Sequence, residues 1–307
     1  MPEIVVLSGK GGTGKTSLTA AFAHLAHQPI ICDLDVDAPD LHLLLGPRPT
    51  RREDFRSGHE AVIDPALCHG CGECHGRCRF EALVAVDGVY RVDPLRCEGC
   101  KVCVHFCPAG AIAFPERLCG QWSISDTRFG PMVHAQLFPG QENSGRLVAL
   151  LRQEARALAR NLGRELILCD GAPGIGCPVI SSLAGADLAV GVCEPTPSGL
   201  HDLKRLAELA AHFRVPLAVI VNKADLSPDR SREIEDFCRQ EGVALAASLP
   251  FDRAVVEAML RAQAVTEHED GEITRRLRQA WEIIARMAAS RPRARHQPQT
   301  NPIEQGD

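Results

Sequence analysis

The feature that most restricts the fold is the glycine-rich segment GKGGTGKT at residues 9–16. It fits G-x-x-x-x-G-K-[S/T] and lies between an apolar run with strand character and a helical pattern, the context that this motif requires. Glycines there let backbone N–H groups turn inward around phosphates, helped by the positive end of the following helix. The alternative is a glycine-rich surface turn, which would not require a strand before it and a helix after it. Because both are indicated here, we predict a phosphate-binding loop. Its predicted nucleotide-binding residues are Gly9, Lys10, Gly11, Gly12, Thr13, Gly14, Lys15, Thr16 and Ser17.

Most of the remaining chain alternates apolar runs of strand character with helical patterns. Continuous apolar strands of this kind are typical of a parallel sheet that is buried on both faces. We therefore predict the α/β class, a P-loop NTPase fold with a mostly parallel sheet flanked by helices. The predicted strands are residues 3–8, 29–33, 165–170, 187–193, 215–221 and 243–248, and the predicted helices are 15–26, 146–161, 198–212 and 229–240.

The alternation stops between the second and third predicted strands, a separation too long for a simple connection. This region contains an internal repeat: IDPALCHGCGECHGRCRFEAL from Ile63 aligns with VDPLRCEGCKVCVHFCPAGAI from Val92, offset by 29 residues. Each half is too small to bury a core alone, so we expect the halves to pair face to face. The predicted domains are 1–57 and 119–289 for the two parts of the P-loop domain, 58–118 for an inserted domain, and 290–307 for a disordered tail.

Both halves of the repeat contain C-x₂-C-x₂-C-x₃-C, the ferredoxin arrangement for two [4Fe–4S] clusters, in which the fourth cysteine of each run binds the other cluster. Zinc is the alternative, although it rarely calls for two tandem runs of this spacing. The proline that usually follows the fourth cysteine is present as Pro108 but is replaced by Arg79 after Cys78. We expect an α+β insert similar to a bacterial ferredoxin. The predicted ligands are Cys68, Cys71, Cys74 and Cys107 for the first cluster, and Cys78, Cys97, Cys100 and Cys103 for the second.

Lys10 makes the phosphate loop more specific. KGGTGKT resembles the deviant Walker A motif of the MinD/Mrp/nitrogenase-iron-protein group of P-loop ATPases, and the resemblance covers the main domain. It implies that Lys10 reaches across a nucleotide-bridged dimer to the partner's phosphates. Lys15 is then expected to contact the β- and γ-phosphates of the nucleotide, and the Thr16 hydroxyl to coordinate Mg²⁺.

Two further stretches resemble the switches of that group. ICDLDVDAPDL places three aspartates after the second strand, where the resemblance assigns Asp35 to the attacking water; Asp37 is equally explained as a helix cap. LILCDGAPGIG places Asp170 at the end of a strand, with Gly174 near the γ-phosphate. The implied catalytic residues are Lys10, Lys15 and Asp35, and the implied Mg²⁺ ligands are Thr16, Asp33 and Asp170.

A base-binding region is indicated by VIVNKAD, with Asn222 and Asp225, and by PFD, with Pro250 and Asp252. A complete N-K-x-D is the usual guanine-recognition motif. Relatives with the deviant Walker A motif nevertheless often have a similar sequence at this place and use ATP. We expect ATP, with GTP as the alternative.

Two other features leave alternatives open. Cys177 follows the second switch, near the place where the nitrogenase iron protein bridges a cluster between subunits, but a structural cysteine is the commoner kind. The last helical pattern, residues 271–290, has one apolar side. We expect it to pack on the sheet, the alternative being membrane binding as in MinD.

The whole chain resembles MinD-superfamily ATPases that contain an inserted ferredoxin domain. This implies an ATPase whose hydrolysis is coupled to electron transfer or to iron–sulfur or metal-cluster assembly on a partner protein. The alternative is a MinD-like positioning or regulatory ATPase with a redox-sensing or purely structural insert. The expected cofactors are ATP, Mg²⁺ and two [4Fe–4S] clusters. The expected partners are a second copy or a paralogue, bound in a nucleotide-dependent way, and a redox or metal-cofactor protein.

Composition and charge limit the partners and the cellular compartment that we expect. A net charge of -5 gives no reason to expect nucleic acid as a partner. Fourteen cysteines in a chain that opens directly on a strand-like run, with no secretory pattern, lead us to expect a reducing cytoplasm. No apolar run approaches the length of a bilayer span, so we expect no membrane-spanning helix and do not expect a membrane as the main partner.

Overall fold

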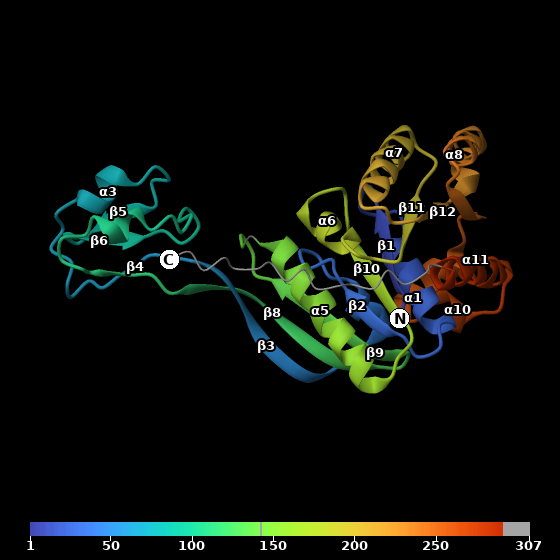
Figure 1. Ribbon diagram of the computed structural model, residues 1–307, viewed down its shortest axis with the longest axis horizontal. Coiled ribbons are helices and arrows are strands. Elements are labelled where there is room, and N and C mark those ends of the chain that lie inside the picture. The colour runs from blue at the N-terminus through green and yellow to red at the C-terminus, as the bar shows by residue number, and fades with distance from the viewer. Residues whose placement is uncertain (142, 291–307) are drawn as a thin grey trace, which may run out of the picture.

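The computed structural model describes residues 1–141 and 143–290. In this part of the chain a nine-stranded sheet forms the main unit, with strand order β13-β12-β11-β1-β10-β2-β9-β8-β3 (Figure 1). Pairing is parallel from β13 to β9, and β8 pairs antiparallel with both β9 and β3. The strands are β1 Glu3–Ser8, β2 Ile30–Asp33, β3 Arg48–His59, β8 Glu116–Thr127, β9 Gly130–Leu137, β10 Ile167–Pro173, β11 Leu188–Cys193, β12 Leu217–Asn222 and β13 Ala244–Leu249.

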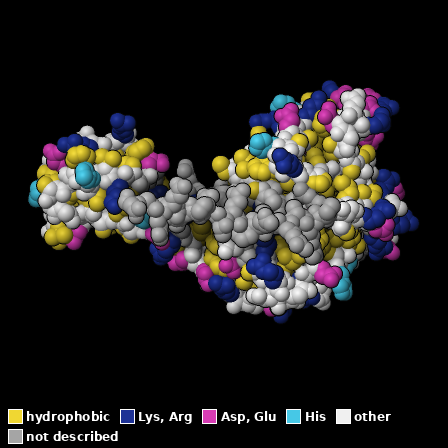
Figure 2. Space-filling view, in the orientation of Figure 1, with side chains coloured by type: hydrophobic (Ala, Val, Ile, Leu, Met, Phe, Trp, Pro, Cys, Tyr) yellow, Lys and Arg dark blue, Asp and Glu magenta, His cyan; other side chains and the backbone are white. Residues whose placement is uncertain are grey.

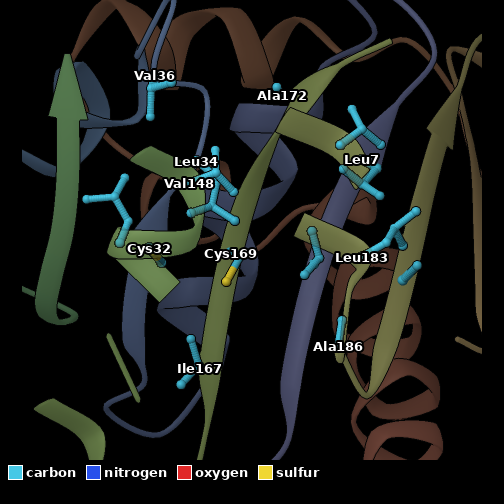
Figure 3. Packing of buried hydrophobic residues seen from close by; sticks show 14 of the residues in the cluster. Leu7, Cys32, Leu34, Val36, Val148, Ile167, Cys169, Ala172, Leu183 and Ala186 are labelled. Atoms are coloured by element: carbon cyan, nitrogen blue, oxygen red, sulfur yellow. The ribbon is translucent and has the colours of Figure 1, made fainter. Parts of the chain in front are cut away.

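Helices cover both faces of this sheet, so successive strand residues enter two different cores. In β1, Val5 and Leu7 pack with α5, α6, α7 and α8, whereas Ile4 and Val6 pack with α1, α2, α9, α10 and α11. Figure 3 shows part of the first core, in which Leu7, Cys32 and Cys169 of the strands pack in one cluster with Val148 of α5 and Leu183 of α6. The helices are α1 Lys15–Leu25, α2 Leu41–Leu45, α5 Ser144–Leu162, α6 Cys177–Leu183, α7 Pro197–His212, α8 Pro228–Gln240, α9 Arg253–Leu260, α10 Val265–His268 and α11 Glu272–Ala289.

The predicted α/β fold is confirmed: all six predicted strands and all four predicted helices are present, with ends shifted by a few residues. The long strand β3 was not predicted. Its sequence, RPTRREDFRSGH, is rich in charge, and only Phe55 and Ser57 of its twelve residues are buried. β3 is an edge strand, and charged side chains are usual on an exposed edge. The apolar pattern that reveals a buried strand is therefore absent.

A second, smaller unit, residues 60–115, stands away from the main unit and is joined to it by β3 and β8 (Figure 1). We call it the cysteine-rich unit. Figure 2 shows positive, negative and hydrophobic side chains interspersed over its visible face. Its elements are β4 Val62–Ile63 paired with β7 Ile112–Ala113, β5 Leu83–Val86 paired with β6 Val89–Val92, and helices α3 Glu73–Arg77 and α4 Val102–His105.

The internal repeat is visible in the backbone of the cysteine-rich unit. The Asp64 N–H donates to the Ala111 carbonyl at 2.8 Å, and 29 residues later the Asp93 N–H donates to the Ala82 carbonyl at 2.7 Å. Ala111 itself lies 29 residues after Ala82, so each half supplies its aspartate to the other. The two halves are therefore paired reciprocally, as the repeat predicts.

The last described helix, α11, packs on the main unit. Ile273, Leu277 and Ile284 are at most 2% exposed, and Trp281 stacks on Phe22 of α1 with ring centroids 5.4 Å apart. No helix in the described ranges is long and apolar enough to cross a membrane. Of the predicted tail, Ser290 is the C-cap of α11, and residues 291–307 lie outside the described residues.

Because Ile284 is fully buried in α11, truncating it should leave a cavity. We expect Ile284→Ala to lower the free energy of unfolding by about 2–5 kcal/mol, measured by urea denaturation. The matched control is Arg278→Ala, an exposed position on the same helix, which should change it by less than about 0.5 kcal/mol. Equal effects of the two substitutions would contradict the packing of α11.

Candidate nucleotide site and cysteine pockets

The glycine-rich loop joins β1 to α1 and has the backbone shape that a phosphate cradle needs. Gly12 and Gly14 have φ values of 81° and 89°, in the left-handed region that favours glycine. Asn222, at the end of β12, donates from Nδ2 to the Thr13 carbonyl at 2.8 Å. A Cβ at Gly14 would lie only 2.5 Å from that Nδ2. Glycine thus lets the loop close against β12.

Asp170 is the centre of the polar contacts beneath the loop. Its side chain is 1% exposed and lies 3.0 Å from Lys15 Nζ. Thr16 donates to it at 2.7 Å and Thr19 at 2.9 Å. The sequence predicted Asp170, Thr16 and Lys15 at this point but not Thr19, whose side chain faces Asp170 from one turn further along α1. Helical spacing of three residues from Thr16 is the signal that points to it.

Asp33 and Asp35 extend this cluster of acidic side chains. Asp33 is opposite Asp170 in the β2–β10 register, and its Oδ1 accepts from the Asp35 N–H at 3.1 Å. Its other oxygen, Oδ2, is buried without a hydrogen-bond partner among the described residues. Burial raises the pKa of Asp33 well above its usual value, and the negative charge of Asp170 adds to this. A buried carboxylate oxygen without a hydrogen-bond partner, on a residue that neighbours Asp170, is a suitable ligand for Mg²⁺.

Lys15 has the opposite charge to this acidic cluster. Burial alone would lower the pKa of Lys15, but the charges of Asp170 and Asp35 raise it above its usual value. Burial raises the pKa of Asp35 to about 6, although the positive charge of Lys15 opposes the shift. Lys15 Nζ is 3.7 Å from Asp35. The ammonium therefore occupies a pocket of carboxylates next to the phosphate loop.

In this structure the Lys10 side chain makes its contacts within its own chain. Its Nζ is 3.3 Å from Glu194 and 3.4 Å from the Thr196 hydroxyl. Glu194 also pairs with Lys223, which in turn donates to the Gly12 carbonyl at 3.2 Å. Partial burial would raise the pKa of Glu194, but the hydrogen bonds and charges of Lys223 and Lys10 lower it. Sequence reasoning missed Glu194; its position directly after β11, at the same sheet edge as the other site residues, was the available signal.

A cleft of about 580 Å³ opens beside the phosphate loop. Besides the loop, it is lined by Asp35, Asn222 and Asp252 and by apolar side chains of α9, α10 and α11. Asp225 is not among the lining residues: it accepts from the Phe251 N–H at 2.6 Å and so fixes the PFD segment. Asp252 caps α9 by accepting from Ala254 at 2.9 Å. Of the predicted base contacts, Asn222, Pro250 and Asp252 therefore line the cleft, and Asp225 does not.

The eight repeat cysteines divide between two separate pockets. Ile63, Tyr90 and Ile112 supply apolar walls of one pocket, and Phe80, Leu83 and Phe114 those of the other. This division matches the two predicted ligand sets, including the exchange of the fourth cysteine between the halves. The first pocket contains Cys68, Cys71, Cys74 and Cys107, and the second contains Cys78, Cys97, Cys100 and Cys103.

The thiols of each set influence one another. Burial, together with the smaller effects of the neighbouring thiols of Cys97 and Cys100, raises the pKa of Cys103 to about 11. Among the described residues, no three His, Cys, Asp or Glu side chains converge closely enough to hold one metal ion. What the structure shows at each pocket is thus a set of four free thiols.

Cys177 begins α6 and is exposed. The remaining cysteines outside the repeat are buried, and Cys32 and Cys169 lie side by side in the β2–β10 register. Cys32 and Cys169 therefore pack in the core as small buried hydrophobic residues.

Comparison with known proteins places this geometry in a family. Residues 4–265 match the CobQ/CobB/MinD/ParA nucleotide binding domain. The chain belongs to this family of P-loop ATPases. Family members of the MinD and ParA type bind ATP with Mg²⁺ and commonly dimerise in a nucleotide-dependent way.

Individual relatives extend the match over most of the chain. An uncharacterized protein of Methanocaldococcus jannaschii is 32% identical over 230 residues, covering 73% of this chain and 79% of that protein. The cell division ATPase MinD of Pyrococcus furiosus has a similar fold, with a TM-score of 0.56 and 17% identity over 93% of this chain and 99% of that one. MinD of Pyrococcus horikoshii, complexed with Mg-ADP, has a TM-score of 0.55 and 17% identity over 94% and 97%. At these identities the solved structures support the fold alone.

The raised pKa of Asp35 predicts a pH dependence. A carboxyl group whose folded pKa lies above its unfolded value contributes stability at low pH, and this contribution is lost as the pH rises through about 6. We therefore expect Asp35→Asn to change the stability of the nucleotide-free protein less at pH 4.5 than at pH 7.5. At pH 7.5 it should increase the stability by on the order of 1–3 kcal/mol.

Chemical denaturation at the two pH values measures this difference. The control is Asp37→Asn, which removes an exposed carboxylate two residues along the chain. A gain for Asp35→Asn of the same size at both pH values would contradict the assignment to Asp35 ionisation.

Proposed function

We propose that this chain is an ATPase whose nucleotide cycle is linked to two [4Fe–4S] clusters in the cysteine-rich unit, and that it transfers electrons to a partner protein. The observation that carries the proposal is the separation of eight cysteines into two sets of four, each at its own apolar pocket. The ferredoxin motif gives these same two sets. Assembly of clusters on a partner is the related possibility, but clusters with a full set of thiolates are better suited to electron transfer than to release.

The residues at each pocket fit a cluster. Each set supplies one thiol for each iron of a cube, which does not require the four sulfurs to converge on one ion. Around the first pocket, the Ala111 N–H points at Cys107 Sγ at 3.4 Å, a contact that stabilises a bound thiolate. Bound there, a cluster would supply a one-electron carrier. We therefore assign Cys68, Cys71, Cys74 and Cys107 to one cluster and Cys78, Cys97, Cys100 and Cys103 to the other.

In the proposed nucleotide cycle, the loop backbone and Lys15 hold the phosphates of ATP. Thr16, Asp33 and Asp170 would hold the Mg²⁺ ion, and Asp35 would orient the attacking water. Lys10 would leave Glu194 and reach the phosphates bound to a second subunit. Loss of the γ-phosphate would release the segments that follow β2 and β10, and the dimer would loosen.

A second candidate function has specific support. The family match and the fold shared with archaeal MinD favour a positioning or regulatory ATPase. In that case the cysteine-rich unit would sense redox state or serve as structure only. The unit buries few apolar residues besides its cysteines, so bound metal can be what folds it.

A redox titration of the loaded protein, followed by electron paramagnetic resonance with and without Mg-ATP, separates the two candidates. Electron transfer linked to ATP predicts that Mg-ATP shifts one midpoint potential by about 60 mV, or about 1.4 kcal/mol for one electron. The control is Lys15→Ala, which should not respond because the phosphates are no longer held. Two fixed potentials would instead favour the regulatory ATPase.

Cross-subunit use of Lys10 predicts that Lys10→Ala abolishes dimerisation in the presence of Mg-ATP while the monomer remains folded. Size-exclusion chromatography with a non-hydrolysed ATP analogue measures the loss. The control is Lys204→Ala, which removes an exposed lysine of α7 and should leave the dimer intact. A dimer that persists in Lys10→Ala would refute this role.

A further inference from the structure

The two cysteine pockets lie in different surroundings although the two halves of the repeat share one fold. A Cβ at Gly70 would lie 2.2 Å from the Gly88 carbonyl oxygen, within the β5–β6 turn. At Gly99, which is the matching position, the same 2.2 Å separates a Cβ from the carbonyl oxygen of His59. His59 is the last residue of β3. The half that contains Cys97 therefore rests directly on a strand of the main sheet, and the other half does not repeat this contact.

Arg117, the second residue of β8, hydrogen-bonds directly to the half that contains Cys97. Its Nη2 donates to the Cys97 carbonyl at 2.7 Å and to the Pro94 carbonyl at 3.1 Å. Its Nε lies 3.3 Å from Glu60, and its side chain is only 18% exposed. The position 29 residues earlier is Gly88, so the repeat supplies no arginine to the pocket of Cys68. One pocket thus has a guanidinium at its first cysteine, and the other has none from the matching position.

A second contact joins the same pocket to β3. The ring of His59 stacks on Phe114 with centroids 5.0 Å apart and planes 7° apart. Phe114 lines the pocket of Cys97. The last residue of β3 and the first residues of β8 therefore both contact the half that contains the Cys97 pocket.

Backbone hydrogen bonds continue from β8 to the first switch. The Phe138 N–H donates to the Cys119 carbonyl of β8 at 2.8 Å, and the Leu137 N–H donates to the Val36 carbonyl at 3.0 Å. Val36 follows Asp35 directly. A displacement of the segment after Asp35 thus acts on the end of β9, which is bonded to β8 two residues from Arg117.

We propose that Arg117 is a positioning residue for the Cys97 site, and that this site alone responds to the nucleotide. The inference rests on the proposed cluster binding. A guanidinium beside a centre that gains negative charge on reduction favours the reduced form, so Arg117 raises the midpoint potential of this site. A shift of β8 alters the contact between Arg117 and the Cys97 carbonyl and thereby changes that potential. The Cys68 site lacks this contact and keeps its potential through the nucleotide cycle.

The test uses full-length protein in which a cysteine substitution disables one of the two cluster sites, so that the other is measured alone. Cys68→Ala leaves the Cys97 site, and Cys100→Ala leaves the Cys68 site. In each background, Arg117→Gln removes the charge, Arg117→Lys keeps the charge but not the paired contacts, and Arg91→Gln removes an exposed charge of the same unit as a control. The iron content of each variant measures how much cluster is bound. A redox titration followed by electron paramagnetic resonance, with and without Mg-ATP, measures the midpoint potential of the remaining cluster.

With Cys68→Ala, we expect Mg-ATP to shift the potential, and Arg117→Gln to make the potential more negative and abolish the shift. Arg117→Lys should keep the potential near its original value but still lose the response, which separates charge from position. With Cys100→Ala, neither nucleotide nor Arg117 should matter. If Arg117→Gln loses iron, the response of Arg117→Lys decides.

An unchanged nucleotide response in the Arg117 variants, or equal responses at both sites, would overturn this inference while leaving the proposed function intact. A parent protein with two loaded sites that respond to nucleotide at neither would instead remove the proposed coupling itself.

Discussion

The buried carboxylate of Asp170 is the interaction on which the nucleotide half of the molecule depends. Burying this side chain beside Asp33 costs solvation free energy, and the ion pair with Lys15 and the hydroxyls of Thr16 and Thr19 offset it. These contacts exist only because β10 lies between β1 and β2. That strand order brings the start of α1 and the ends of β2 and β10 to one edge of the sheet. The phosphate loop therefore owes its shape and its charge environment to contacts within the chain itself.

The cysteine-rich unit obeys a different constraint, because it must leave the sheet and return without disturbing it. The chain leaves on β3 and returns on β8, which are antiparallel neighbours, and the Glu60 N–H still donates to the Pro115 carbonyl at 3.1 Å. The two ends of the unit therefore start side by side, which keeps the entropic cost of a long insertion small. Within the unit, the buried apolar residues are Ala61, Cys74, Ala82, Leu83, Ala111 and Ile112, with further cysteines packed around them. So small a core makes groups bound to the thiols a natural source of stability.

The sequence predicts the parts of this structure that depend on local pattern. Continuous apolar runs give the parallel strands, and the spacing of the cysteines gives both pocket sets with their exchanged fourth members. It does not predict β3, whose single exposed edge and charged side chains leave no apolar pattern. Nor does it predict that Glu194 pairs with Lys10 or that Asp225 fixes Phe251 instead of lining the cleft. Such contacts are decided by which loops meet at the sheet edge, and residue type alone carries no record of that.

An internal repeat would by itself give two equivalent pockets, and the attachment to the sheet removes the equivalence. β3 ends and β8 begins against the half that contains Cys97, since Gly99 contacts His59 and Arg117 reaches the Cys97 carbonyl. The joining strands belong to the sheet itself, on the side that carries β9 and β2. Packed elements of this kind respond to a switch as a unit because they have few intermediate arrangements. On such a support, the duplicated module has one pocket in contact with the strands of the main sheet and one pocket that lacks this contact.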